Sequence, residues 1–261
     1  MLYTCRVWIF NLLEYSLIAL SLPLLSVIIP AHNEENRLPR SLEQVFAFLK
    51  QQSYGSEVLV VENGSSDHTY ELAREFVSGH KNLRVIHEAG RGKGLAVRRG
   101  MLEARGEYRF MCDADLSMPI EEVNKFLPPA RSNFDIAIGS REAEDSVRYD
   151  EPFYRHFGGR LINFAIRLLI LPGLQDTQCG FKCFRAGAAE HLFSRQTLNG
   201  WSFDIELLFI ACRFGYRIIE VPIDWYYRPE SKVSTVPDAL RLIGDIFLIH
   251  ANARRGIYDT H

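Results

Sequence analysis

The chain has 261 residues, of which 47% are hydrophobic and 24% charged, and its formal net charge at pH 7 is -2. This length can bury a sizeable core in one large or two small domains, and the composition is that of an ordinary globular protein. A net charge so close to zero gives no support to a general nucleic-acid-binding role. The five cysteines form no Cys-x-x-Cys pair. We therefore expect neither a disulfide framework nor a zinc site, but reduced thiols in a reducing compartment.

The N-terminal segment 7–25 is mostly apolar and approaches the roughly 20 residues that span a bilayer. Glu14 lies near its centre, where a charge is costly in a membrane. No clear cleavage site separates the segment from the strand that follows, so a removed signal peptide is not expected. We expect a membrane-associated helix within residues 1–23. The alternatives are a helix packed on the domain and an extension that stays disordered.

Strands alternate with helices in the next hundred residues. Continuous apolar runs predict buried strands over 24–30, 57–61 and 83–86, and from Tyr108 up to Asp113. Helical spacing predicts helices over 41–50, from a cap at Ser66 or Asp67 through 77, and from Gly94 through 104. This alternation is typical of an α/β fold with a mostly parallel sheet and right-handed crossovers.

The alternation loosens after residue 115. The expected helices are 121–127, 153–171, 204–214 and an amphipathic helix over 238–252. A strand is expected over 134–138, a turn at Gly180, an extended strand or hairpin over 216–227, and a polar loop over 229–237. Without a repeat or a clear linker, residues 24–255 are expected to form one domain with two halves, 24–115 and 116–255, followed by a tail 256–261.

Polar loops follow four of the predicted strands and therefore share one edge of the sheet. These loops cover 30–34, 62–67, 90–94 and 113–115. Open α/β sheets bind ligands at this edge, so we expect a site there. Asp113 and Asp115 end a buried strand, and carboxylate pairs of this kind suit Mg²⁺ or Mn²⁺, which shares its other positions with water and substrate phosphates. A solvated Asp-rich turn is the alternative for this motif taken alone.

The motifs in this order resemble those of family 2 glycosyltransferases. The segment 27–35 is similar to the opening motif of the family, 60–67 to its second motif, and 113–115 to its metal motif. Four further motifs resemble the polyprenyl-phosphate sugar transferases, especially the dolichyl-phosphate glucosyltransferase and mannose synthase type: 91–94, 139–141, 178–182 and 231–233. The resemblance implies a GT-A fold, a nucleotide-diphosphate sugar donor and inversion at the anomeric carbon. Glu62 and Asn63 stand where the family usually has two aspartates, which leaves the donor open.

The resemblance and the residue types together assign nucleotide-sugar binding to the half 24–115, the donor side. Asp115 is the expected metal ligand, with Asp113 as the second ligand or as a ribose contact, and the metal would stabilise the departing nucleotide. Lys93 offers a point charge for the diphosphate, and Glu62 or Asn63 can hydrogen-bond a ribose or base. The expected donor-binding residues are Pro30, Ala31, Asn33, Glu34, Glu62, Asn63, Lys93, Asp113, Ala114 and Asp115.

The acceptor half, 116–255, is expected to bind a phosphate with cations. The candidate cations are Arg141, Arg160 and Lys232, since arginine suits bidentate phosphate binding and the Lys232 loop could close over substrate. Gln178, the fourth expected acceptor-side residue, is expected to face the sugar. Asp115, Arg141 and Lys232 are the expected catalytic residues. Arg160 has a surface ion pair as its alternative.

Three further residues have open roles on the acceptor side. Trp201 stacks on the sugar or belongs to the core. Asp204 and Glu206 are candidate general bases, or acids that favour a helix N-terminus.

The sequence thus predicts a metal-dependent inverting hexosyltransferase. The favoured donor is UDP-glucose, with GDP-mannose as the alternative, and the expected acceptor is a polyprenyl or dolichyl phosphate. The expected place is the cytoplasmic face of a membrane, and the oligomeric state stays open. Rival hypotheses are transfer to a glycan or protein hydroxyl, a nucleotide-sugar-binding module without turnover, and a nucleotidyltransferase. The acidic, glycine-free loop 31–35 argues against the last, which would carry a glycine-rich basic phosphate loop there.

Overall fold

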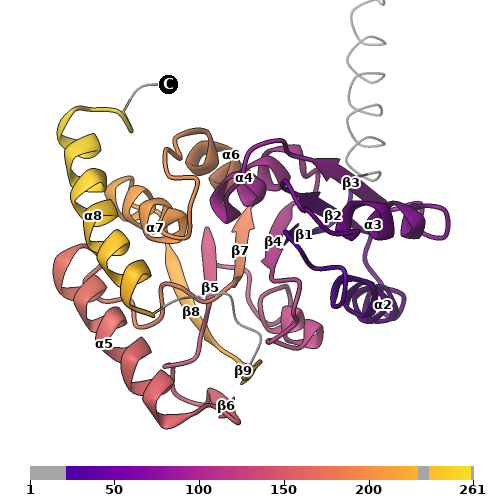
Figure 1. The fold of residues 1–261 in the computed structure, drawn as a ribbon, viewed down its shortest axis with the longest axis horizontal. Helices are drawn as coiled ribbons and strands as arrows, with labels where there is room; N and C mark the ends of the chain where they lie inside the picture. Colours follow the sequence, from indigo (N-terminus) through magenta and orange to yellow (C-terminus); the bar gives the residue numbers. More distant parts are fainter. Residues whose placement is uncertain (1–21, 229–234, 260–261) are drawn as a thin grey trace, which may run out of the picture.

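The computed structural model describes residues 22–228 and 235–259, and for 154–157, 161 and 235–240 it describes the backbone alone. Its centre is a seven-stranded sheet with the order β3-β2-β1-β4-β7-β5-β8 (Figure 1). The strands are β1 (Leu25–Ala31), β2 (Ser56–Glu62), β3 (Leu83–His87), β4 (Tyr108–Cys112), β5 (Ile136–Ser140), β6 (Val147–Tyr149), β7 (Phe181–Arg185), β8 (Ile218–Pro222) and β9 (Asp224–Tyr226). The helices are α2 (Leu38–Leu49), α3 (Thr69–Val77), α4 (Lys93–Glu103), the 3-10 helix η1 (Ile120–Lys125), α5 (Phe153–Leu169), α6 (Ala186–Ser194), α7 (Phe203–Arg213) and α8 (Thr235–Arg254).

The strands of the first half are all parallel, as the alternation of strands and helices predicts. β1 pairs with β2 and β4, and β2 pairs with β3, each in parallel. β7 is antiparallel to both β4 and β5, while β8 is parallel to β5. The expected α/β class, with a mostly parallel sheet and flanking helices, is therefore confirmed.

The central strands are mostly apolar because helices cover both faces of the sheet. Successive side chains point to opposite faces. Val27 and Ile29 join the core beneath α2 and η1, whereas Ile28 joins the core beneath α4, α6 and α7. The two buried clusters hold the polar loops at the carboxyl ends of β1 to β4 on a rigid base.

The second half differs from the expectation in its details. Residues 216–227 form two strands that belong to different sheets: β8 joins the main sheet, and β9 pairs in parallel with β6 in a small two-stranded sheet. The segment 177–185 supplies an antiparallel strand, followed by the short helix α6, which the sequence analysis missed. The predicted cap at Ser66 or Asp67 is displaced by one residue: His68 occupies the N-cap of α3 and makes no side-chain cap bond, while Asp67 Oδ1 accepts from the N–H of Thr69, the first helical residue, at 3.1 Å.

The predicted membrane helix falls mostly in residues 1–21, which lie outside the described part of the chain. Among residues 22–228 and 235–259, no helix has both the length and the apolar character needed to cross a membrane.

Candidate active site

The Asp113–Asp115 turn directly follows β4 and is held by three hydrogen bonds. Leu116 N–H donates to the Asp113 carbonyl at 3.2 Å, and Ser117 N–H donates to Asp115 Oδ1 at 2.9 Å. The Ser41 hydroxyl of α2 donates to the Ala114 carbonyl at 2.6 Å. These bonds hold the turn and the Asp115 carboxylate at the centre of the sheet edge, so the alternative of a solvated loop does not describe this turn.

Lys93, the first residue of α4, lies against Asp113. Its Nζ is 2.6 Å from Asp113 Oδ1, and the Trp201 ring centroid is 5.0 Å from the same nitrogen. Burial alone would lower the pKa of Lys93, but the Asp113, Asp204 and Asp115 carboxylates together outweigh burial and raise it. Lys93 is therefore a fixed positive charge beside the carboxylate pair.

Gly180 lets the strand β7 approach Asp113 closely. A Cβ at this position would lie 1.9 Å from Asp113 Oδ2 and 2.5 Å from its Cγ. No side chain fits that space unless the carboxylate moves. The expected turn glycine is thus a contact residue of the carboxylate pair, where backbone has to come close to a functional group.

A cavity of about 510 Å³ opens over this edge and joins both halves of the chain. Nine of the predicted site residues line it: Pro30, Glu34, Asn63, Lys93, Asp113, Ala114, Asp115, Arg141 and Gln178. Trp201 and Asp204 line it too. Trp201 is 46% exposed, so the alternative of a core tryptophan is wrong.

Four predicted residues lie elsewhere, and a fifth is not described. Ala31 is buried in the core. Asn33 holds the next loop, since its Oδ1 accepts from Ser66 N–H at 2.8 Å. Arg160 is 65% exposed and 3.9 Å from Glu142 Oε2, which matches the surface ion pair given as its alternative. Glu62 faces a neighbouring pocket, and Lys232 lies outside the residues that the structure describes.

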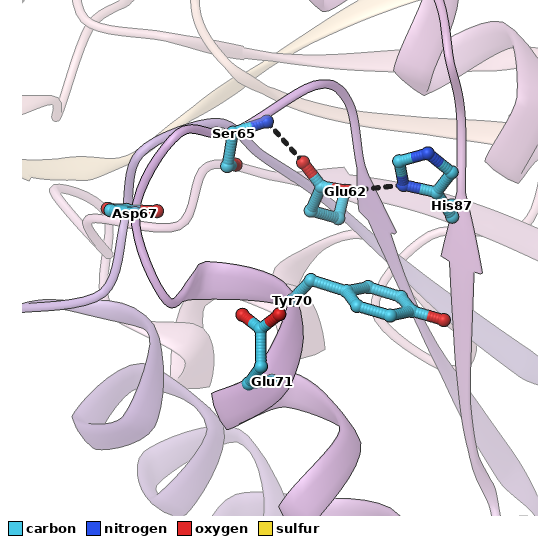
Figure 2. Close-up of a pocket in the computed structure, with 6 residues that line it drawn as sticks. All are labelled: Glu62, Ser65, Asp67, Tyr70, Glu71 and His87. Carbon is cyan, nitrogen blue, oxygen red and sulfur yellow. Dashed lines mark hydrogen bonds and ion pairs between the residues drawn. The ribbon is translucent and has the colours of Figure 1, made fainter.

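Glu62 is engaged by its own loop and by β3 (Figure 2). One carboxylate oxygen accepts from Ser65 N–H at 2.5 Å, and the other is 2.6 Å from His87 Nδ1. Burial alone would raise the pKa of Glu62, but the hydrogen bonds from Ser65 and His87 hold it below its usual value. The side chain shapes the second motif instead of lining the main cavity.

Asn63 makes hydrogen bonds that explain why an asparagine stands where the family usually has an aspartate. The side-chain Nδ2 of Asn63 donates to the Gly92 carbonyl at 3.1 Å, and the backbone carbonyl of Asn63 accepts from His32 Nδ1 at 2.9 Å. A carboxylate has no hydrogen to donate to Gly92. The side-chain amide thus joins the loops after β2 and β3, and the backbone carbonyl joins the loop after β1 to them, so the three loops form one wall of the cavity.

The glycines around Lys93 press against the loop that carries Trp201. A Cβ on Gly92 would lie 2.2 Å from the Asn199 carbonyl oxygen, and one on Gly94 would lie 2.7 Å from Phe203 Cβ. Gly92 also has a φ of +135°, which L side chains rarely adopt. The close backbone approach expected from these glycines is thus present, and it joins the donor-side loop to the 198–203 loop.

The two candidate bases have different surroundings. Glu206 is fully buried and does not line the cavity. Its carboxylate accepts hydrogen bonds from Thr197 N–H at 3.0 Å, from Leu198 N–H at 2.8 Å and from the Tyr258 hydroxyl at 2.8 Å. It anchors the Trp201 loop to the C-terminal segment, so its assignment as a base is wrong.

Asp204 lines the cavity but is paired. Its Oδ1 lies 3.1 Å from Nζ of the buried Lys182. Burial raises the pKa of Asp204 even though Lys182 and Lys93 act in the opposite direction.

The acceptor half of the cavity combines arginines with aromatic rings. The Arg141 guanidinium pairs with the buried Asp176 and lies 5.6 Å from the Trp225 ring centroid. Arg148 lies 6.0 Å from the same ring and pairs with Glu142 and Glu151. The sequence analysis missed Arg148 and Trp225, and the aromatic run 225–227 was the available signal. The cavity also reaches Ile162 of α5 and Leu242 of α8.

The carboxylate pair fits a hard divalent cation in its chemistry. Asp113 and Asp115 offer oxygen ligands, which Mg²⁺ and Mn²⁺ prefer. Within the described ranges no group of three His, Cys, Asp or Glu side chains could hold a metal alone. Mg²⁺ is commonly bound by one or two carboxylates with substrate phosphates and water, and two carboxylates that line an open cavity fit this donor set.

Residues 26–193 match the family model described as glycosyl transferase family 2. The chain is 37% identical over 240 residues to the dolichyl-phosphate beta-glucosyltransferase of Drosophila melanogaster, covering 86% of this chain and 74% of that protein. It is 33% identical over 249 residues to the human protein of the same name, covering 90% and 77%.

Among solved structures, the chain resembles glucosyl-3-phosphoglycerate synthase from Mycobacterium tuberculosis in complex with Mn²⁺, UDP-glucose and phosphoglyceric acid. The TM-score is 0.61 and the identity 20%, and the match covers 87% of this chain and 79% of that one. At this identity the likeness shows the fold alone.

Proposed function

Because the chain belongs to glycosyl transferase family 2 and is a glycosyltransferase, we propose that it moves glucose from UDP-glucose to a polyprenyl phosphate of the dolichyl type. The main observation behind this proposal is one cavity, which joins the Asp113–Asp115 turn to the arginines and aromatic rings of the acceptor half. The names of the curated relatives support the acceptor and the sugar. GDP-mannose stays the alternative donor.

In the proposed reaction, a phosphate oxygen of the acceptor attacks the anomeric carbon of the sugar from the face opposite the nucleotide. The new bond joins that oxygen to the anomeric carbon, the bond to the β-phosphate breaks, and UDP leaves with the electron pair. A phosphate is already an anion at neutral pH, so no side chain has to remove a proton. Asp204, paired with Lys182, is not required as a base.

On the donor side, Lys93 holds a positive charge at the diphosphate, and Trp201 offers an apolar face to the sugar. When bound at Asp113 and Asp115, a divalent metal would neutralise the charge that develops on the departing diphosphate. We assign three contributions to the protein: it positions the substrates, it neutralises their charges, and its 198–203 loop excludes water.

Comparing the transfer rates of Arg141→Ala and Asp204→Asn tests whether the acceptor is a phosphate. Losing one charged hydrogen bond to a phosphate costs about 1.5–3 kcal/mol, which corresponds to a roughly ten- to hundredfold slower transfer. We expect Arg141→Ala to slow single-turnover transfer to polyprenyl phosphate to this extent, with donor affinity by calorimetry unchanged. Asp204→Asn should lower thermal stability but slow the transfer less. A large loss in Asp204→Asn beside normal Arg141→Ala would favour a hydroxyl acceptor.

A membrane surface is the second proposed partner, because α5 and α8, which pack against each other (Figure 1), expose large apolar side chains. Phe164 of α5 is 61% exposed and Phe247 of α8 is 68% exposed. Leu168, Leu169, Ile243 and Leu248 are exposed on the same helices, as are the cations Arg167 and Arg241. Apolar side chains beside arginines fit an anionic lipid interface. We assign the cytoplasmic face, where free thiols such as the four described cysteines stay reduced.

Full-length protein with Phe164→Glu and Phe247→Glu together is expected to sediment less with anionic vesicles than the unaltered chain, because two charges would enter the apolar layer. Leu102→Glu is the matched control, since Leu102 is exposed on α4, away from this surface. Equal sedimentation of the double variant and the control would contradict the proposed docking face.

A further inference from the structure

Arg141 follows β5 directly, and its guanidinium is bound along one edge. Nε donates to Asp176 Oδ2 at 2.7 Å, and Nη2 donates to Asp176 Oδ1 at 2.9 Å. The Arg141 backbone N–H donates to Asp176 Oδ2 at 3.0 Å. Such paired bonds between a planar fork and a carboxylate fix the orientation of the arginine as well as its position.

Asp176 is itself held rigidly. It is fully buried in the loop between α5 and β7. Its backbone N–H donates to Glu220 Oε1 at 3.0 Å, and Gln175 N–H donates to Glu220 Oε2 at 2.9 Å. Burial alone would raise the pKa of Asp176, but Arg141 holds it at about 2. The carboxylate is therefore charged at neutral pH and anchored to β8 through Glu220.

The remaining surfaces of Arg141 have distinct surroundings. The Trp225 ring, whose centroid is 5.6 Å from Cζ, covers part of the guanidinium. The outer edge, formed by Nη1 and the second hydrogen of Nη2, has no hydrogen-bond partner among the described residues, and Arg141 lines the cavity. The contacts with Asp176 thus leave free the edge that can bind two oxygens of one phosphate.

We propose that Asp176 is a positioning residue, which acts on the reaction only by holding the Arg141 guanidinium with its outer edge toward the acceptor phosphate. The inference rests on the proposed function, since it takes the acceptor to be a phosphate. Asp176 touches no substrate. Without it, the Arg141 side chain is free to adopt other rotamers, and the acceptor must then select one of them.

A double-mutant cycle of Asp176→Asn and Arg141→Ala tests the inference, with UDP-glucose and a short-chain isoprenyl phosphate as substrates. We expect Asp176→Asn to raise the KM for the isoprenyl phosphate about tenfold, comparable to one charged hydrogen bond, with donor affinity by calorimetry unchanged. In the Arg141→Ala background the same substitution should have no further effect, because the group that Asp176 positions is gone.

Asp259→Asn is the matched control. Asp259 pairs with Arg213 through both oxygens, at 3.0 and 2.9 Å from Nη2, and neither residue lines the cavity. This variant should leave both KM values unchanged, and thermal unfolding of all variants separates a lost contact from a lost fold.

Losses that add in the double variant would overturn the inference, as would an Asp176→Asn protein that melts earlier yet keeps the normal KM for the acceptor. An unaltered chain that does not use the isoprenyl phosphate at all would instead remove the proposed acceptor, and the inference with it.

Discussion

Replacing Asp115 with alanine is expected to abolish metal-dependent binding of UDP-glucose and to slow glucosyl transfer about 10²- to 10⁴-fold, the range that follows from several kcal/mol of charge stabilisation by a metal. Asp115 lies at the end of β4, and its Oδ1 also accepts the Ser117 N–H. The substitution removes one of the two carboxylates that follow β4. Calorimetry with UDP-glucose, run once with Mn²⁺ and once with chelator, measures the metal-dependent part directly.

Asp115→Asn separates the charge from the turn. The amide oxygen can still accept from Ser117 N–H, so the loop should keep its shape, while the charge that favours a divalent cation is lost. We expect donor affinity to stop depending on Mn²⁺ in this variant, at an unchanged melting temperature. Full turnover of the unaltered chain in excess chelator would contradict the metal assignment.

Gly180→Ala is expected to reduce transfer about 10²-fold, the loss that accompanies a displacement of about 1 Å in a catalytic site. The added methyl would lie 1.9 Å from Asp113 Oδ2. The carboxylate can swing away, because it is the end of a side chain, so the fold should survive. When the Asp113 carboxylate moves, it loses its contact with Lys93 Nζ, which is 2.6 Å from Oδ1. It also moves away from the place where it would bind the metal.

Gly187→Ala is the matched control, because a Cβ there meets nothing within 4 Å. It should retain full activity and the normal donor affinity. The readouts are the melting temperature and the Mn²⁺-dependent affinity for UDP-glucose. If Gly180→Ala binds UDP-glucose and Mn²⁺ as the unaltered chain does, Asp113 does not belong to the donor site.

The sheet edge could be predicted from the sequence because its determinants are local. The predicted strands 24–30 and 57–61 become the buried parallel strands β1 and β2, and the loops after parallel strands meet at one edge of the sheet. The Asp113–Asp115 turn, Lys93 and Arg141 accordingly line one cavity. The glycines around Lys93 also revealed a close backbone approach, since few other features require glycine at that spacing.

Side-chain direction could not be predicted, because it depends on partners distant in sequence. Glu62 turns toward His87 on the next strand, and Glu206 turns toward Thr197 and Tyr258. Glu62 lies within a motif and Glu206 near the start of a predicted helix, so both resemble site residues by position alone. Asp176 stands just before the motif 178–182, but nothing local ties it to Arg141; the two meet because the loop before β7 crosses the end of β5.

The small sheet of β6 and β9 could not be predicted from the sequence either. Three-residue strands carry too little periodic signal to be recognised, and 216–227 resembles one hairpin because Pro222 and Ile223 do not interrupt its apolar pattern. In the structure β9 leaves the main sheet to pair with β6. That departure brings Trp225 over both Arg141 and Arg148 and so completes the acceptor half of the cavity.

The most direct test of the proposed function is product detection with the full-length chain. The protein is incubated with polyprenyl phosphate, Mn²⁺ and either UDP-glucose or GDP-mannose, and the lipids are analysed by mass spectrometry. The expected result is a polyprenyl phosphate heavier by one hexose unit with UDP-glucose, and none in the Asp115→Ala protein. Failure to modify polyprenyl phosphate with either donor, while the same donor glycosylates a sugar or protein hydroxyl, would contradict the proposed acceptor.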